Sequence, residues 1–369
     1  MRVLMLSKAC IVGIYQRKLE HIAAAGVDLL TVVPPTWEDE RGPMPLERVY
    51  TAGYTLHATP VRFNGQFHLH YYPALPALIR AFSPHIVHID EEPYNLATWH
   101  ALWHARRAGA KTLFFTWQNI HRTYPPPFRW GEAWVLRHAD AAIAGTQSAA
   151  DVYRAKGYTG PLAVIPQFGV DPALFRPVRQ RAVRPFTLGY IGRLVPEKGL
   201  DVLLTALAQL KGAWQLRIVG GGPQRQDLEQ QAAALGIHQR ITFVAQVPST
   251  QMPAQYHQLD ALVLPSLTRN NWKEQFGRVL VEAMASGVPV IGSDSGAIPD
   301  VVGEAGVIVP EGDPHALADA IRRLRDESGR QAHLAQLGQQ RVQTHFTHAQ
   351  VARQTLAVYR TLHQLPLER

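Results

Sequence analysis

Two glutamates, Glu274 and Glu282, stand eight positions apart in a segment that otherwise predicts a buried helix. The helix, roughly 277–286, is apolar almost all round, and a helix of that composition packs inside a core. A carboxylate such as that of Glu282 is costly to bury without partners. Phe276 and Gly277 precede this helix, and the N–H groups at a helix N-terminus attract anions. The segment predicts a ligand with an anionic part and hydroxyl groups, with a structural glutamate held by an arginine as the alternative.

A pair of cations follows another strand. Residues 192–199, GRLVPEKG, come directly after an apolar strand predicted at 186–191. Arg193 can bind two phosphate oxygens at once, and Lys198 adds a mobile positive charge. Two cations at the start of a helix suit a diphosphate, although a solvated basic loop has the same composition. We expect both side chains to lie in the open, so that truncating either one leaves the fold intact.

Glycines mark the same region. Gly192 opens the cationic segment, and the GGGP run at 220–223, which includes Gly222, follows a strand predicted at 214–219. Glycines let a ligand approach the backbone closely, and a simple tight turn is an equally good explanation. A third loop connects the strand at 261–264 to Glu274. All three loops follow the carboxyl ends of strands, where parallel sheets bind their ligands.

Strands and helices alternate in two rounds along the chain. The first round occupies 1–178 and the second 186–346, with a basic, proline-bounded linker predicted at 175–185. The sequence predicts an α/β fold of two Rossmann-like, doubly wound domains that face each other across a cleft. It also predicts a β-hairpin around Asn64-Gly65, flanked by the segments 57–61 and 66–72.

Composition limits the class of protein. The 369 residues are 46% hydrophobic and 18% charged, which is typical of a soluble protein with two domains. We find no apolar run of about 18 residues and no signal-peptide layout, and the single Cys10 fits the cytoplasm. A net charge of +8 and a pI of about 9.7 favour phosphorylated ligands or anionic lipid. Nucleic acid is not expected, because aromatic-interleaved RNA motifs and Cys/His fingers are missing. His100 and His104 have a zinc-compatible helical spacing but no evident third ligand, so no metal is expected.

The motifs of the second half resemble the donor-binding half of glycosyltransferase family 4 from about 187 to 310. They are GRLVPEKG, GGGP, EQFGRVLVEAMASGVPV with its two glutamates, and SGAIPD at 295–300. The first half fits more loosely, at 85–93 and 165–175. The resemblance implies GT-B architecture and a retaining, metal-independent hexosyltransferase without a cofactor, which uses a UDP- or GDP-linked sugar. It also implies that a final helix within 347–369 packs back on the first domain.

The residue roles of that family are implied position by position. Glu282 would bind the nucleotide ribose, and Glu274 would lie at the donor sugar. Arg193 and Lys198 would hold the diphosphate and stabilise it as it leaves, so these two cations and Glu274 are the implied catalytic residues. The implied donor-binding residues are Gly192, Arg193, Lys198, Gly222, Glu274, Phe276, Gly277 and Glu282.

The first half departs from the family pattern at two positions. Its first loop, SKACIVGIY, contains only Gly13 where many members carry two glycines. Gln118 stands where many members have a histidine, with Asn119 beside it and His121 a turn later. We expect these four residues on the acceptor side of the cleft. The departures motivate one alternative, a catalytically silent nucleotide-sugar-binding subunit. A GT-B phosphorylase or epimerase is a further alternative.

The acceptor class stays open between a glycan, a lipid and a small molecule. Peripheral contact with the inner face of a membrane is a further expectation. It rests on the net charge of +8 and on the closeness of Arg122, Arg129 and Trp130 in the sequence.

Overall fold

The computed structural model describes residues 1–39, 42–177, 184–248 and 251–364. The chain divides into two compact units. The first unit is Met1–Gly169 with the C-terminal segment His348–Arg369, and the second unit is Val170–Thr347. Each unit is built around one parallel β-sheet.

The first unit has a seven-stranded parallel sheet in the order β5-β2-β1-β6-β7-β8-β9. Its strands are β1 (Arg2–Leu6), β2 (Asp28–Val33), β5 (Thr55–Ala58), β6 (Ile86–Ile89), β7 (Lys111–Thr116), β8 (Ala141–Ala144) and β9 (Leu162–Val164). Its helices are α1 (Arg17–Ala24), α2 (Leu75–Phe82), α3 (Leu96–Arg107), α4 (Phe128–His138), α5 (Gln147–Ala155) and α13 (His348–Gln364). A small antiparallel pair, β3 (Thr36–Asp39) and β4 (Gly42–Pro45), lies outside this sheet.

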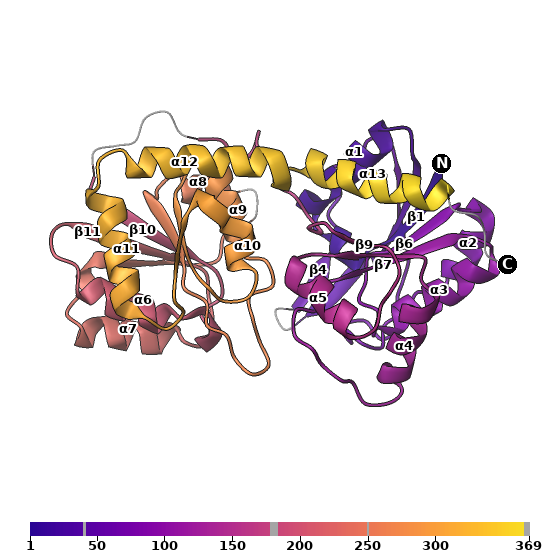
Figure 1. Ribbon diagram of the computed structural model, residues 1–369, viewed down its shortest axis with the longest axis horizontal. Helices are drawn as coiled ribbons and strands as arrows, with labels where there is room; N and C mark the ends of the chain where they lie inside the picture. The colour runs from indigo at the N-terminus through magenta and orange to yellow at the C-terminus, as the bar shows by residue number, and fades with distance from the viewer. Residues whose placement is uncertain (40–41, 178–183, 249–250, 365–369) are drawn as a thin grey trace. The chain divides into compact units, whose positions relative to one another are not determined.

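Helices cover both faces of this sheet (Figure 1). Val3 and Met5 of β1 belong to one buried cluster, which includes side chains of α1 and α13. Leu4 and Leu6 belong to a second cluster, which includes side chains of α2, α3, α4 and α5. Because neighbouring strand residues point to opposite faces, the fully apolar run of β1 is what a doubly wound sheet requires.

The second unit has a six-stranded parallel sheet in the order β12-β11-β10-β13-β14-β15, the Rossmann order. Its strands are β10 (Phe186–Ile191), β11 (Trp214–Val219), β12 (Ile241–Val244), β13 (Ala261–Leu264), β14 (Val290–Ser293) and β15 (Val307–Val309). Its helices are α6 (Leu200–Ala208), α7 (Arg225–Ala234), α8 (Met252–Tyr256), α9 (Arg278–Ala285), α10 (Ile298–Val302), α11 (Pro314–Asp326) and α12 (Arg330–Arg341). Contacts join α6 to α7 and α11, and α9 to α8, α10 and α12, on opposite sides of the sheet (Figure 1).

The boundary between the units lies earlier than the sequence predicts. Residues 170–177 belong to the second unit, not to a first domain that ends at 178. Val170 forms a bridge with Thr347, and the Phe175 ring packs edge-on against Tyr256. These contacts are between residues far apart in sequence, so the basic composition of the segment could not reveal them. The central part of the predicted linker, 178–183, lies outside the described residues.

The C-terminal helix α13 returns to the first unit, where it packs against α1 and on the sheet. The Tyr359 hydroxyl lies 2.7 Å from Nδ1 of His88, which is buried on β6. The five residues that follow α13, 365–369, lie outside the described residues. None of the helices in the described part of the chain is long and apolar enough to cross a membrane.

The predicted hairpin around Asn64-Gly65 is only a turn. One isolated antiparallel bridge joins Arg62 to Tyr71, and the preceding strand, β5, belongs to the parallel sheet. The Asn64 side chain donates to the backbone oxygen of Thr36 and accepts from the backbone of Glu38. The predicted turn is therefore present, but the turn bonds to β3 and is not flanked by two paired strands.

Candidate functional site

Three loops meet at the carboxyl edge of the second sheet, after β10, β11 and β13. The loop after β10 is held against the GGGP loop, because Leu194 donates its N–H to the Gly221 oxygen. A Cβ on Gly220 would lie 2.0 Å from the Gly192 oxygen, and one on Gly222 would lie 2.4 Å from the Leu194 oxygen. These two glycines are required because the loops touch backbone to backbone, whereas a Cβ on Gly221 would meet nothing within 4 Å.

Lys198 and Glu274 form a largely buried ion pair at this edge. The Lys198 Nζ lies 2.6 Å from the Glu274 carboxylate, and the two side chains are 13% and 9% exposed. Ser266 donates to the same carboxylate oxygen, and the Lys198 ammonium lies 4.8 Å from the centroid of the Trp272 ring. Ala297 donates its N–H to the backbone oxygen of Glu274, which connects the glutamate backbone to the loop after β14. The structure therefore places an acid and a cation from separate loops in direct contact.

Arg193 has a different environment. Its side chain is 60% exposed, and its guanidinium lies 3.8 Å from Glu197. Its backbone is fixed, because the buried Tyr190 hydroxyl donates to the Arg193 oxygen at 2.7 Å. A fixed backbone with an exposed, weakly paired guanidinium suits a residue that turns toward an anionic ligand.

Glu282 is buried in α9 and has two protein partners. Its carboxylate accepts from Arg278 Nε at 2.6 Å and from the Tyr256 hydroxyl at 2.7 Å. Burial and the neighbouring carboxylate raise the pKa of Tyr256 well above its ordinary value. The arrangement is the one expected for a structural glutamate held by an arginine. Each carboxylate oxygen can accept a second hydrogen bond, so these contacts still leave capacity for hydroxyl donors.

The start of α9 carries the other expected donor-binding residues. Gly277 is its N-cap residue and has φ 73°, a left-handed conformation that favours glycine. No cap side chain covers the helix N-terminus there. The Phe276 ring packs at 72° against Phe346, with centroids 5.8 Å apart, so it is held within the second unit.

The first unit has its own polar edge, where β6 and β7 end. Glu92 accepts from the Thr116 hydroxyl at 2.6 Å and from the Trp117 N–H at 2.7 Å. Both polar atoms of the Gln118 side chain have hydrogen-bond partners here. Its oxygen accepts from the Tyr153 hydroxyl and from Lys156 Nζ at 2.7 and 2.9 Å, and its nitrogen lies 3.3 Å from the Tyr124 hydroxyl.

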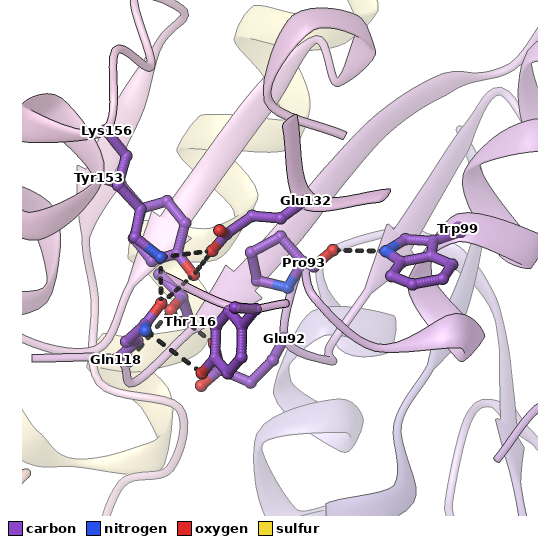
Figure 2. A network of polar contacts seen from close by, with 9 residues as sticks. Glu92, Pro93, Trp99, Thr116, Gln118, Glu132, Tyr153 and Lys156 are labelled. Carbon is purple, nitrogen blue, oxygen red and sulfur yellow. Dashed lines mark hydrogen bonds and ion pairs between the residues drawn. The ribbon is translucent and has the colours of Figure 1, made fainter. Parts of the chain in front are cut away.

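Two charges complete this network (Figure 2). Lys156 pairs with Glu132 at 2.6 Å, and both side chains are 7% exposed. The sequence prediction named Gln118 but missed Glu92, Glu132 and Lys156. Three consecutive acids directly after an apolar strand, at 90–92, were the available signal for Glu92.

The other residues expected in the first unit lie apart from this network or at its margin. Gly13 donates its N–H to the Glu47 carboxylate at 2.6 Å, and a Cβ there would lie 2.3 Å from Val49. Segment 47–49 therefore covers Gly13. Asn119 is buried and His121 is exposed.

Glu92 predicts a pH dependence of stability. Burial raises the pKa of this carboxyl group to about 7 from an ordinary value of 4.5, although two hydrogen bonds oppose the shift. The folded protein then holds the proton more tightly than the unfolded chain. The resulting stabilisation is complete below pH 4.5 and is lost as the pH rises through 7. At ~1.4 kcal/mol per pKa unit, the stability of the wild type relative to Glu92→Gln should fall by a few kcal/mol across this range.

Urea unfolding of the wild type and of Glu92→Gln at a series of pH values measures this difference. Comparing the two proteins cancels the titration of other groups. A difference that does not change with pH would show that Glu92 keeps an ordinary pKa in the folded state.

Within the described residues, no three His, Cys, Asp or Glu side chains are grouped so that they could hold a metal ion. The His100 and His104 rings contact each other at 71°, with centroids 4.7 Å apart. Burial, with a smaller contribution from His104, lowers the pKa of His100 to about 4.

Two family models match the chain. The model described as glycosyl transferases group 1 matches residues 174–341, and the model described as glycosyl transferase 4-like domain matches 14–167. These ranges fall in the second and first units respectively.

Curated relatives share the sequence in part. A GDP-mannose-dependent alpha-(1-6)-phosphatidylinositol monomannoside mannosyltransferase of Mycolicibacterium smegmatis is 31% identical over 258 residues, 63% of this chain and 66% of the relative. A D-inositol 3-phosphate glycosyltransferase of Salinispora tropica is 32% identical over 258 residues, 62% of this chain and 52% of the relative. The matches thus span about half to two thirds of the length of these relatives.

Solved structures share the fold along the whole chain. Sucrose-phosphate synthase from Thermosynechococcus elongatus has a TM-score of 0.71 and 24% identity, covering 98% of this chain and 99% of that one. Anabaena HepE in complex with UDP has a TM-score of 0.72 and 19% identity, covering 98% and 100%. The two matched models leave only short segments of the chain unmatched. Together with the shared fold, they show that the chain belongs to the group 1 and family 4-like glycosyltransferases, which have the GT-B fold.

Proposed function

We propose that this protein is a retaining glycosyltransferase that moves a hexose from a nucleotide-diphosphate sugar to a glycan, lipid or small-molecule acceptor. The observation that carries the proposal is the contact between Lys198 and Glu274 at the carboxyl edge of the second sheet. The names of the relatives support it, since one is GDP-mannose-dependent, and the HepE structure contains UDP. The proposed donor is accordingly a sugar linked to UDP or GDP.

In this proposal the second unit binds the donor. Arg193 and Lys198 hold the diphosphate, Glu274 lies at the sugar, and Glu282 accepts hydrogen bonds from the ribose hydroxyls. Lys198 then exchanges part of its contact with Glu274 for phosphate oxygens. This exchange frees the carboxylate to accept hydrogen bonds from sugar hydroxyls.

The proposed reaction is a displacement on one face of the sugar. The bond from the anomeric carbon to the phosphate oxygen breaks, and the acceptor oxygen bonds to the same face of that carbon. The acceptor proton passes to the departing phosphate. Negative charge grows on the diphosphate during this step, and fixed cations stabilise such charge without requiring a metal ion.

A catalytically silent nucleotide-sugar-binding subunit is the second candidate. It is favoured by the first unit, where the Gly13 N–H and the Gln118 side chain are already bonded to the protein. Slow hydrolysis of a nucleotide sugar without acceptor separates the two, because a silent subunit binds the donor but does not cleave it. Formation of a sugar 1-phosphate would instead indicate a GT-B phosphorylase, and an altered donor sugar an epimerase.

Glu282→Ala should weaken donor binding more than it lowers turnover at saturating donor. Ribose contacts are the same in the bound donor and in the transition state, so their loss is a loss of uniform binding. Donor titration and turnover at saturating donor measure the two effects. Tyr256→Phe is the matched control, because it removes one protein partner of Glu282 and keeps the carboxylate. Unchanged donor affinity in Glu282→Ala, with a lowered melting temperature, would assign Glu282 to the structural role.

The donor itself is identified by thermal shift with a panel of UDP- and GDP-linked sugars. The proposal expects one nucleotide sugar to raise the melting temperature well above the others. A panel without any stabilising member would contradict the proposed donor site.

A further inference from the structure

Residues 57–138 of the first unit contribute exposed arginines, but no exposed carboxylates, to the protein surface. Seven arginines in this segment are exposed, and its four acids are all buried. The exposed arginines are Arg62, Arg80, Arg106, Arg107, Arg122, Arg129 and Arg137. The buried acids are Asp90, Glu91, Glu92 and Glu132. The surface that this segment contributes therefore carries cations but no exposed carboxylate.

The same segment exposes large apolar side chains. Phe63, Phe67, Leu69, Trp103 and Trp130 are 53%, 39%, 39%, 47% and 63% exposed. They make up five of the eight exposed large hydrophobic residues in the described part of the chain. Single exposed apolar residues are ordinary on a protein surface, but a concentration of them marks an interaction site.

A chain of ring contacts makes part of this surface continuous. Phe63 lies 6.3 Å from Tyr71, and Tyr71 lies 5.4 Å from His100, between ring centroids. His100 contacts His104, which contacts Trp103 at 4.5 Å. Arg107 then lies over the Trp103 ring at 4.8 Å. The contacts run from the 62–71 loop along the outer side of α3.

The α4 helix lies beside α3 (Figure 1). Trp99 of α3 lies against Phe128 at the start of α4, and Arg106 at the end of α3 donates to the His138 oxygen at the end of α4. The two helices are therefore parallel neighbours. Arg129 and Trp130 are exposed on the first turn of α4. We refer to the exposed arginines and large apolar side chains of residues 57–138, among them Phe63, Trp103, Arg107, Arg129 and Trp130, as the basic aromatic face.

We propose that the basic aromatic face binds the surface of an anionic phospholipid membrane. Arginines near such a surface are attracted to its negative charge, and tryptophan is favoured at the boundary between headgroups and acyl chains. The combination fits a lipid surface better than a soluble polyanion, which would gain little from exposed Phe, Leu and Trp side chains. Because the face contains none of the residues assigned to sugar transfer, its test does not require an active enzyme.

Vesicle sedimentation with the full chain tests the proposal. Binding should be strong to mixed phosphatidylcholine and phosphatidylglycerol vesicles and weak to phosphatidylcholine alone. It should be lost in high salt, because the screening length falls from ~10 Å at 0.1 M to ~3 Å at 1 M. Arg107→Gln/Arg129→Gln should lower the partition coefficient by roughly 20- to 30-fold, about fivefold for each arginine.

The matched control is Arg225→Gln/Arg322→Gln, which removes two exposed arginines of the second unit, each paired with an acid one turn away. It changes the net charge equally and should bind vesicles like the wild type. An equal loss in the control would show that only net charge matters, and would overturn the proposal. So would equal binding of the wild type to neutral and anionic vesicles.

Trp103→Ala/Trp130→Ala separates lipid from soluble polyanion. Both side chains are exposed, so the fold should survive, and an unchanged melting temperature checks this. The variant should lose vesicle binding but keep any binding to dextran sulfate. Wild-type vesicle binding in this variant, competed away by dextran sulfate, would assign the face to a soluble polyanion instead.

Discussion

Arg193→Ala should lower turnover at saturating donor by about 10²–10³ and leave the melting temperature unchanged. In the proposed mechanism its guanidinium stabilises the negative charge that grows on the diphosphate as the glycosidic bond breaks, so its loss affects the transition state more than the bound donor. The side chain is 60% exposed with a long contact to Glu197, so the fold does not depend on it. Arg193→Lys should rescue turnover only in part, because lysine lacks the planar fork.

Arg225→Ala is the matched control for this prediction, since it removes another exposed arginine of the second unit. Its turnover should match that of the wild type. Near-normal turnover in Arg193→Ala would remove Arg193 from the leaving-group role. A large fall in its melting temperature would instead give this arginine a structural role.

Lys198→Ala should lower turnover by a similar factor of about 10²–10³, and it should also destabilise the protein. The structure corrects the expectation that both cations lie in the open. Lys198 is largely buried against Glu274, so its removal leaves a carboxylate without its countercharge. Breaking such a pair costs on the order of 3 kcal/mol. Turnover assays combined with thermal unfolding measure both effects.

The double variant Lys198→Ala/Glu274→Gln separates stability from catalysis. Neutralising Glu274 removes the buried charge, and its amide can still meet the Ser266 hydroxyl. The double variant should therefore regain much of the lost melting temperature while turnover stays low, and Glu274→Gln alone supplies the reference. Recovery of turnover together with stability would mean that Lys198 serves the fold and not the leaving group.

The strands and loops of the second unit could be predicted well from the sequence, because their signals are local. A strand, a short loop and a helix N-terminus follow one another along the chain, and parallel topology brings such loops to one edge. The pairing of Lys198 with Glu274 could not be predicted, since these residues come from loops 76 positions apart. The partner that Tyr256 supplies to Glu282 is equally non-local.

The first unit was harder to predict, because its polar residues are fixed by tertiary contacts. Gln118 was expected to face an acceptor. Instead its side chain bonds to Tyr153 of α5 and to Lys156, which directly follows α5, and neither partner belongs to a recognisable sequence motif. Gly13 was expected on the acceptor side of the cleft, but the side chains of Glu47 and Val49 pack over it. The strand–helix alternation and the return of α13 followed from pattern and resemblance, whereas the boundary at 170 depended on the contacts of Val170 and Phe175.

The most direct measurement is to follow, by proton NMR, a nucleotide sugar with an α-linked hexose during incubation with the protein and no acceptor. Water then takes the acceptor's place. The proposed function predicts slow release of the nucleoside diphosphate, with the α-anomer of the free sugar appearing first and with much less release by Arg193→Ala. First appearance of the β-anomer would contradict retention, and a bound donor that is never cleaved would contradict transferase activity altogether.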